Sequence, residues 1–170
     1  MTVARIKLPL LRSLFYGMAV KLFLDVDGVM LGLDDGRARR AALARHACDF
    51  LEFALANCEV FWLTTHCRGS IAPVTRHLVQ HAPQSERERL LGLISRVRPT
   101  RFETFKTEAL PKEEEPFLWV DDSPTGAELD WLRARGWLDR WLWVDTRDEP
   151  EDLLRARRWL EERLELAAGA

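Results

Sequence analysis

The sequence predicts an α/β fold, a three-layer Rossmann-like domain with a central, mostly parallel sheet and no large cap domain. Short apolar runs of strand length alternate along the chain with longer segments whose apolar residues recur at helical spacing. The short runs are apolar almost without interruption, as expected of strands buried on both faces between helices. The chain has 170 residues, of which 47% are hydrophobic and 31% charged, which fits one globular domain.

Each expected strand is a short apolar run, and each expected helix is an amphipathic segment. We expect strands at residues 20–26, 59–64, 117–120 and 140–144. We expect helices at residues 38–56, 70–80, 103–110, 125–135 and 150–166. Pro73 is compatible with the second helix because it falls in the first turn, and Gly136 typically follows a helix end. The pattern of residues 83–100 is compatible with a helix, with a strand near Leu91–Val97, or with one followed by the other.

The first 17 residues precede the first expected strand. Arg12 interrupts their short apolar patch, and no small-residue cleavage site precedes Lys21, so we do not expect a signal peptide. We expect residues 1–17 to be an N-terminal extension, with Met18 as a second candidate start, and residues 18–170 to form a single domain.

Charge and cysteine content narrow the range of functions. The net charge of −2 gives no strong field for nucleic acid or anionic membranes, and no apolar run reaches transmembrane length. Basic clusters at residues 37–40 and 96–101 are most simply solvated surface. The three cysteines have no paired spacing, which favours reduced thiols and a cytoplasmic location.

Acidic residues stand at the carboxyl ends of two of the expected strands. Asp25 and Asp27 stand at the end of the first strand, and Asp121 and Asp122 follow the strand at 117–120. In an open parallel sheet the functional crevice lies beyond the carboxyl ends of the strands, so these side chains are expected to converge. Converging carboxylates repel each other unless a cation lies between them, and a few hard oxygen ligands suit Mg²⁺. The sequence therefore predicts a magnesium site at this edge.

Four short motifs, in this order, resemble those of the haloacid dehalogenase-like (HAD) phosphohydrolase superfamily. They are LFLDVDGV, VFWLTT, FETFKTEAL and FLWVDD, and the resemblance extends from about Lys21 to the last helix. An Asp-x-Asp-Gly sequence alone is a weak signal, whereas four motifs at strand or helix ends are a specific one. The resemblance implies a Mg²⁺-dependent hydrolase of phosphate monoesters that forms an aspartyl-phosphate intermediate.

The resemblance also implies catalytic roles for single residues. Asp25 would be the nucleophile, and Asp27 the general acid that protonates the leaving oxygen and then the base that activates water. Thr64 would hydrogen-bond a phosphate oxygen, and Lys106 would contact both Asp25 and the phosphate. The hydroxyl of Thr65 stays an alternative to that of Thr64, because a one-residue slip exchanges the faces of a strand.

The metal ligands follow from the same resemblance. Mg²⁺ would be bound by Asp25, by the backbone carbonyl of Asp27 and by Asp121. Asp122 would bind it through water or would hold Lys106. Lys112 stays a fallback for Lys106, although it precedes an acidic linker.

Simpler interpretations and other functions have to be considered. Acidic residues are common in turns and at helix N-caps, so either pair alone could be structural. A phosphotransferase on the same fold or a non-catalytic HAD-like binding module are the alternative functions. Cys67 and His66 lack partners at zinc-site spacing in the sequence, so we expect them to line the pocket or pack.

The spacing of the motifs leaves no room for an enclosing cap. Only the stretch Met30–Arg39 separates the first motif from its helix, and Cys67–Phe105 is used by the fold itself. We therefore expect an open site, with a short flap around Met30–Gly36. An open site would admit a small phosphorylated substrate or a bulky one such as a protein side chain or a nucleic-acid end, whereas a membrane partner is not expected.

Overall fold

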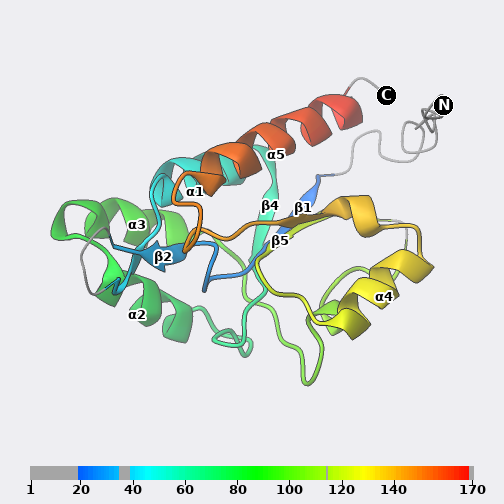
Figure 1. The fold of residues 1–170 in the computed structure, drawn as a ribbon, viewed down its shortest axis with the longest axis horizontal. Coiled ribbons are helices and arrows are strands. Elements are labelled where there is room, and N and C mark those ends of the chain that lie inside the picture. The colour runs from blue at the N-terminus through cyan, green and yellow to red at the C-terminus, as the bar shows by residue number, and fades with distance from the viewer. Residues whose placement is uncertain (1–18, 35–38, 114, 169–170) are drawn as a thin grey trace.

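A four-stranded parallel sheet forms the centre of the molecule, as the computed structural model shows for residues 19–34, 39–113 and 115–168 (Figure 1). Its strand order is β4-β1-β5-β6. The strands are β1 (Lys21–Leu24), β4 (Glu59–Trp62), β5 (Phe117–Asp121) and β6 (Trp141–Trp143). Leu24 of β1 pairs with Trp62 on one side and Val120 on the other, so β1 lies in the middle. The predicted parallel sheet is confirmed. Our expectation for residues 1–17 and Met18 lies outside the described residues.

Helices cover both faces of the sheet. They are α1 (Ala47–Asn57), α2 (Ala72–His81), α3 (Arg87–Ile94), α4 (Gly126–Ala134) and α5 (Asp152–Ala168). Short 3₁₀ turns occur at η1 (Gln84–Glu86), η2 (Lys106–Glu108) and η3 (Leu138–Arg140). Residues 83–100, left open by the sequence, form η1, α3 and a single parallel bridge from Arg98 to Phe61. The segment 103–110, predicted as a helix, contains only the turn η2.

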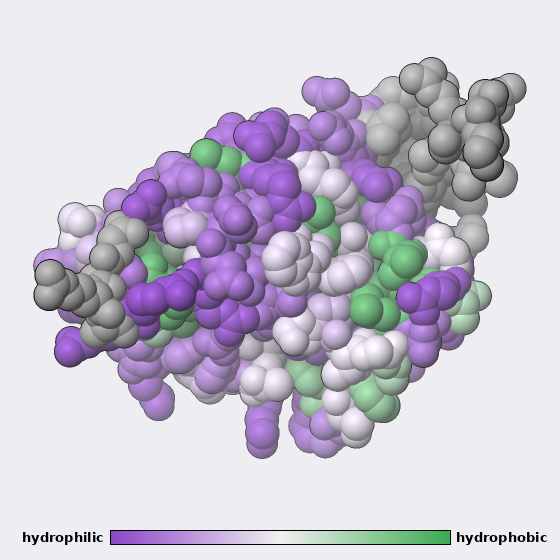
Figure 2. Space-filling view, in the orientation of Figure 1, coloured by the Kyte–Doolittle hydropathy of each residue, from purple (hydrophilic) through white to green (hydrophobic). Residues whose placement is uncertain are grey.

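The two faces of the sheet bury separate apolar clusters. Leu22 and Leu24 of β1 pack with residues of α1, α2, α3 and α5, whereas Phe23 packs with Leu132 of α4 and with Trp137. This alternation follows from the pleat, which directs successive side chains to opposite faces. Figure 2 shows that α5 presents mostly hydrophilic residues outward, while apolar side chains gather toward the α4 side. The result is the predicted three-layer arrangement.

A small antiparallel hairpin, β2 (Leu31–Leu33) and β3 (Ala41–Leu43), follows β1. The prediction of one helix over residues 38–56 is therefore wrong in its first part. The alanines and arginines of this stretch favour a helix locally, but Leu43 pairs with Leu31 across the hairpin and Ala44 N donates to Met30 O at 2.9 Å. His46 then adopts a left-handed conformation with φ 62°, so the helix begins only at Ala47.

No large cap domain is present among the described residues, in agreement with the prediction from motif spacing. The hairpin β2–β3 is all that separates β1 from α1 in the part of the chain that is described. Along the same described ranges, no helix combines the length and apolarity needed to cross a membrane.

Candidate active site

Asp25, Lys106 and Asp121 form a buried ionic cluster at the carboxyl edge of the sheet. Asp25 directly follows β1, and its backbone N–H donates to Val120 O of β5 at 3.0 Å. The Lys106 ammonium, delivered by η2, lies 2.8 Å from Asp25 Oδ2 and 2.6 Å from Asp121 Oδ2. The exposed fractions of the side chains are only 13% for Lys106, 9% for Asp25 and 0% for Asp121. The structure thus brings together three of the predicted site residues, and it places Lys106 rather than Lys112 among them.

The electrostatics of this cluster show an excess of buried negative charge. Burial and the neighbouring Asp25 carboxylate raise the pKa of Asp121 to about 7, against the opposing effect of Lys106. Burial would lower the pKa of Lys106, but the attraction of Asp25 and Asp121 outweighs it and the pKa is raised. Trp119 Nε1 and Ser123 N also donate to Asp121, at 3.0 and 2.9 Å. The carboxylate of Asp121 is therefore held in a fixed orientation.

Asp122 faces the same site and is paired with Arg147, which follows β6. Arg147 is itself anchored by Asp145, whose Oδ1 accepts from its backbone N at 3.0 Å and from its Nε at 3.2 Å. Burial raises the pKa of Asp122 to about 6, assisted by repulsion from Asp25 and Asp145 and opposed by Arg147. No motif in the sequence indicates Arg147 as the partner of Asp122.

Gly28 makes room for this ion pair. Its φ is +76°, and a Cβ added to it would lie 2.4 Å from Asp122 Oδ2 and 2.7 Å from the Arg147 guanidinium. Its carbonyl accepts hydrogen bonds from the backbone N and Oγ1 of Thr146, at 2.8 and 3.1 Å. A glycine after the second aspartate is therefore favoured both by the backbone conformation and by the Asp122 and Arg147 side chains, which occupy the space that a Cβ would take.

Asp27 lies beside two histidines and not in the buried cluster. Its Oδ2 lies 2.8 Å from His66 Nε2 and its Oδ1 2.9 Å from His77 Nε2. Its side chain is 49% exposed. Burial would raise the pKa of Asp27, but the hydrogen bonds from His77 and His66 outweigh it and the pKa is lowered. His66 reaches Asp27 from the loop after β4, whereas His77 reaches it from α2 and was not anticipated.

The loop after β4 buries one of the two candidate threonines and exposes the other. Thr64 is buried and its Oγ1 accepts from His66 N at 3.4 Å, whereas Thr65 is exposed. Cys67 is buried and its Sγ contacts Ser70 O and Thr100 O, so this cysteine packs inside the loop.

Two groups of side chains in the described residues have the proximity needed to hold a metal ion. Asp25, Asp121 and Asp122 each offer a carboxylate oxygen, and these oxygens lie within 4.8 Å of one another. Asp27, His66 and His77 form a second group by the same measure. The predicted metal ligands Asp25, Asp121 and Asp122 therefore converge, while the Asp27 side chain belongs to the other group.

Comparison of the chain with protein-family models and with curated proteins found no match in either case. The four motifs and the geometry of the site are therefore the features that indicate a function.

Proposed function

We propose that this chain is a Mg²⁺-dependent, HAD-type phosphohydrolase that cleaves phosphate monoesters through an aspartyl phosphate on Asp25. The observation that carries the proposal is the buried contact of Lys106 with both Asp25 and Asp121 at the carboxyl edge of a parallel sheet. A carboxylate becomes a useful nucleophile toward an anionic phosphate only where cations offset the repulsion. This arrangement supplies one such cation and a place for a second.

The chemistry of the donor set fits Mg²⁺. Three carboxylates converge on one point, and Lys106 and Arg147 offset only part of their charge. Burial and mutual repulsion raise the pKa of Asp121 and Asp122 toward neutrality, which signals carboxylates that lack sufficient positive charge. Asp25 and Asp121 would hold the ion, with Asp122 close enough to bind it directly or through water. When bound, Mg²⁺ would neutralise phosphate oxygens and the negative charge that develops during transfer.

In the proposed first step, a carboxylate oxygen of Asp25 attacks phosphorus while the bond from phosphorus to the ester oxygen breaks. Lys106, beside Asp25, orients the nucleophile and offsets the charge of the incoming phosphate. The leaving oxygen takes a proton from Asp27 and departs as an alcohol.

In the proposed second step, water attacks phosphorus, Asp27 takes the proton, and the bond to Asp25 breaks to release inorganic phosphate. The hydrogen bonds from His66 and His77 favour the ionised form of Asp27, which is the form that this step requires. The same hydrogen bonds disfavour the protonated form of Asp27, which is the form that donates a proton in the first step.

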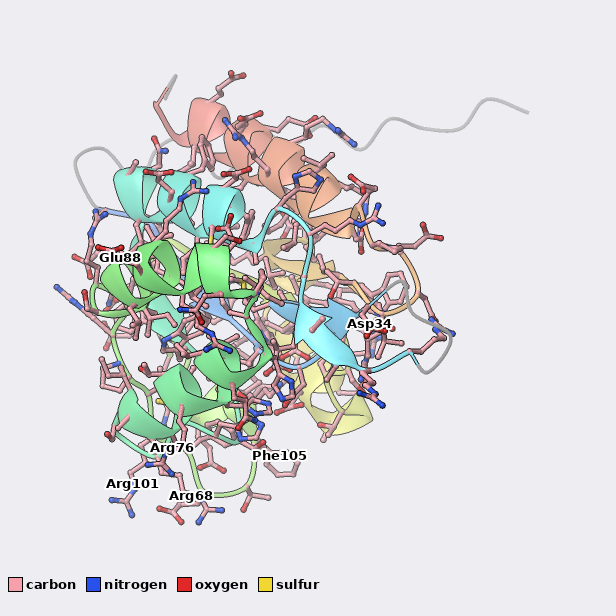
Figure 3. All side chains as sticks on the ribbon, turned by 90° about the vertical axis from the view of Figure 1, so that its left-hand side faces the viewer. Asp34, Arg68, Arg76, Glu88, Arg101 and Phe105 are labelled. Carbon is pink, nitrogen blue, oxygen red and sulfur yellow. The ribbon has the colours of Figure 1, made fainter. Side chains whose placement is uncertain are left out.

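The substrate we propose is bulky, such as a nucleic-acid end or a phosphorylated protein side chain, because the described residues include no large cap over the site. Arg68, Arg76 and Arg101 are exposed at the end of the molecule that holds the loop after β4, with the exposed ring of Phe105 on the segment before Lys106 (Figure 3). Arg68 and Arg101 belong to adjacent segments, because Gly69 N donates to Thr100 O at 2.8 Å. Guanidinium groups and an open aromatic ring suit phosphates and bases of a polynucleotide. A reducing compartment such as the cytoplasm belongs to the same proposal.

Hydrolysis of an aryl phosphate, measured with Mg²⁺ and with EDTA, tests the proposed activity. We expect turnover only with Mg²⁺, and loss of turnover in Asp25→Asn while circular dichroism stays unchanged. Substantial activity of Asp25→Asn would refute the mechanism. A panel of metabolite phosphates, phosphopeptides and end-phosphorylated oligonucleotides then tests the substrate class. Clear preference for a small metabolite would refute the bulky-substrate proposal alone, and transfer to an added alcohol in place of water would favour a phosphotransferase.

A further inference from the structure

We propose that Asp27, His66 and His77 form a binding site for a Zn²⁺-type divalent ion, distinct from the carboxylate cluster, and that an ion bound there switches the enzyme off. The first half of this proposal rests on the geometry of the three side chains alone. The second half rests on the proposed function, because it assumes that Asp27 is the acid–base group.

The three ligands come from three separate segments that fold to one point. Asp27 follows β1, His66 follows β4, and His77 lies on α2. Their ligand atoms lie within 4.8 Å of one another, and the two Nε2 atoms lie 2.8 and 2.9 Å from the Asp27 oxygens. Zinc bound to nitrogen and oxygen at about 2.0–2.1 Å in a tetrahedron separates its ligand atoms by roughly 3.3 Å. Binding therefore requires only small adjustments of three side chains whose ligand atoms already lie within 4.8 Å of one another.

The donor types distinguish this site from the acidic one. Two imidazole nitrogens and one carboxylate oxygen are ligands typical of Zn²⁺, whereas Mg²⁺ prefers oxygen alone. All three side chains are partly accessible, with 35% of His66, 22% of His77 and 49% of Asp27 exposed. An ion can thus enter from solvent and keep water in a fourth position, as in open zinc sites.

The surroundings of His77 suit a metal ligand as well. Gln80 Nε2 lies 3.2 Å from His77 Nδ1, so that in this arrangement the amide donates and His77 carries its proton on Nε2, toward Asp27. With Nε2 on a metal, the proton moves to Nδ1 and needs an acceptor. Rotation of the Gln80 amide by half a turn presents Oε1 to Nδ1 and meets that need, at the cost of the contact of Gln80 Nε2 with His81 Nε2 at 3.0 Å.

Occupancy of this site would remove the proton transfer that hydrolysis requires. An ion bound to one oxygen of Asp27 lowers the basicity of the whole carboxylate, so Asp27 takes a proton far less readily, and the ion displaces the two N–H donors that face Asp27. Excess Mg²⁺ would not relieve the inhibition, because it competes poorly for the imidazole nitrogens.

Co²⁺ is the probe for binding, since its visible absorption reports a site of low coordination number. Titration of the full chain in saturating Mg²⁺ should give one saturable site, with an absorption that Zn²⁺ abolishes at one equivalent. His66→Gln and His77→Gln should each weaken Co²⁺ binding at least tenfold, with unchanged circular dichroism. His46→Gln is the matched control, because His46 pairs with Glu151. Asp25→Asn should keep the spectrum and so separates this site from the catalytic cluster.

Binding that survives in the His66→Gln/His77→Gln double variant, or no saturable binding to the wild type, would overturn the site. Zn²⁺ inhibition of aryl-phosphate hydrolysis in excess Mg²⁺ tests the second half. Inhibition should require at least tenfold more Zn²⁺ in a His variant that retains measurable turnover. Full activity of the zinc-loaded wild type would overturn the switch. If no preparation hydrolyses phosphate esters, the proposed function fails, while the Co²⁺ titration still decides whether the site exists.

Discussion

Replacement of Lys106 by methionine should destabilise the protein in a pH-dependent way. The ammonium is the common partner of two buried carboxylates, at 2.8 and 2.6 Å, and 13% of its side chain is exposed. Removing one partner of a buried ion pair costs about 3–5 kcal/mol, because it leaves an uncompensated charge. Lys106→Met should therefore lose about 3 kcal/mol of unfolding free energy at pH 8 in EDTA, near the lower limit because Asp25 is not fully buried.

The loss should shrink as the pH falls. The pKa of Asp121 in the folded protein is already raised to about 7, above its unfolded value. The native state therefore binds more protons than the unfolded state between those values, and lower pH favours folding through this group. Without Lys106 the pKa of Asp121 rises further, so at pH 5.5 the carboxyl is neutral and less than half of the loss should remain.

Urea unfolding in EDTA at pH 8 and pH 5.5 measures both effects. Lys112→Met is the matched control, because Lys112 is exposed, and it should change stability by less than about 0.5 kcal/mol. Adding Asp121→Asn to Lys106→Met should recover part of the loss at pH 8, since it removes the unpaired charge. Equal stability of Lys106→Met and wild type at pH 8 would refute the view that Lys106 neutralises this cluster.

Three further predictions concern the surroundings of the site. His77→Gln removes a hydrogen bond that lowers the pKa of Asp27, so Asp27 should stay protonated to higher pH. With an alkyl phosphate, whose leaving oxygen needs that proton, turnover should therefore persist to higher pH, and an unshifted pH profile of kcat would contradict this. Burial raises the pKa of Cys58 to about 12, so about one thiol in ten thousand is ionised at pH 8 and iodoacetamide should label it only after unfolding; rapid labelling of the native protein would be inconsistent. Gly28→Ala should cost about 2 kcal/mol of unfolding free energy, because the strain of its φ is joined by displacement of the Asp122 and Arg147 side chains. Gly136→Ala, with φ +68° and open space, should cost about 1 kcal/mol; equal losses would show that crowding at the site is unimportant.

The strands and the edge of the sheet at which the carboxylates gather could be predicted because both are local signals. A buried strand appears as an apolar run, and the carboxylates stand at its end, so parallel pairing alone brings Asp25 and Asp121 together. Lys106 could be chosen over Lys112 only through the motif resemblance, since the segment that delivers it is a single 3₁₀ turn and not the predicted helix. The structure then shows the contacts of Lys106 with Asp25 and Asp121.

The contacts that the sequence did not indicate join residues far apart in the chain. His77 reaches Asp27 from a helix 50 residues further on, and nothing near either residue marks the pair. The pair of Arg147 with Asp122 is similar, because it depends on where the segment after β6 crosses Gly28. The hairpin strand Ala41–Leu43 was missed for a different reason: helix propensity is weak, and cross-strand pairing with β2 overrides it.

The identity of the phosphorylated group tests the proposed mechanism most directly. The protein should be mixed with an aryl phosphate and Mg²⁺, quenched with acid within the first turnover, digested, and analysed by mass spectrometry. We predict one phosphoryl group on the peptide that contains Asp25, bound as an acyl phosphate that hydroxylamine removes, and none in Asp25→Asn. Release of phosphate over many turnovers with no phosphorylated peptide at any quench time, together with retained turnover by Asp25→Asn, would contradict the assignment of Asp25 as the nucleophile.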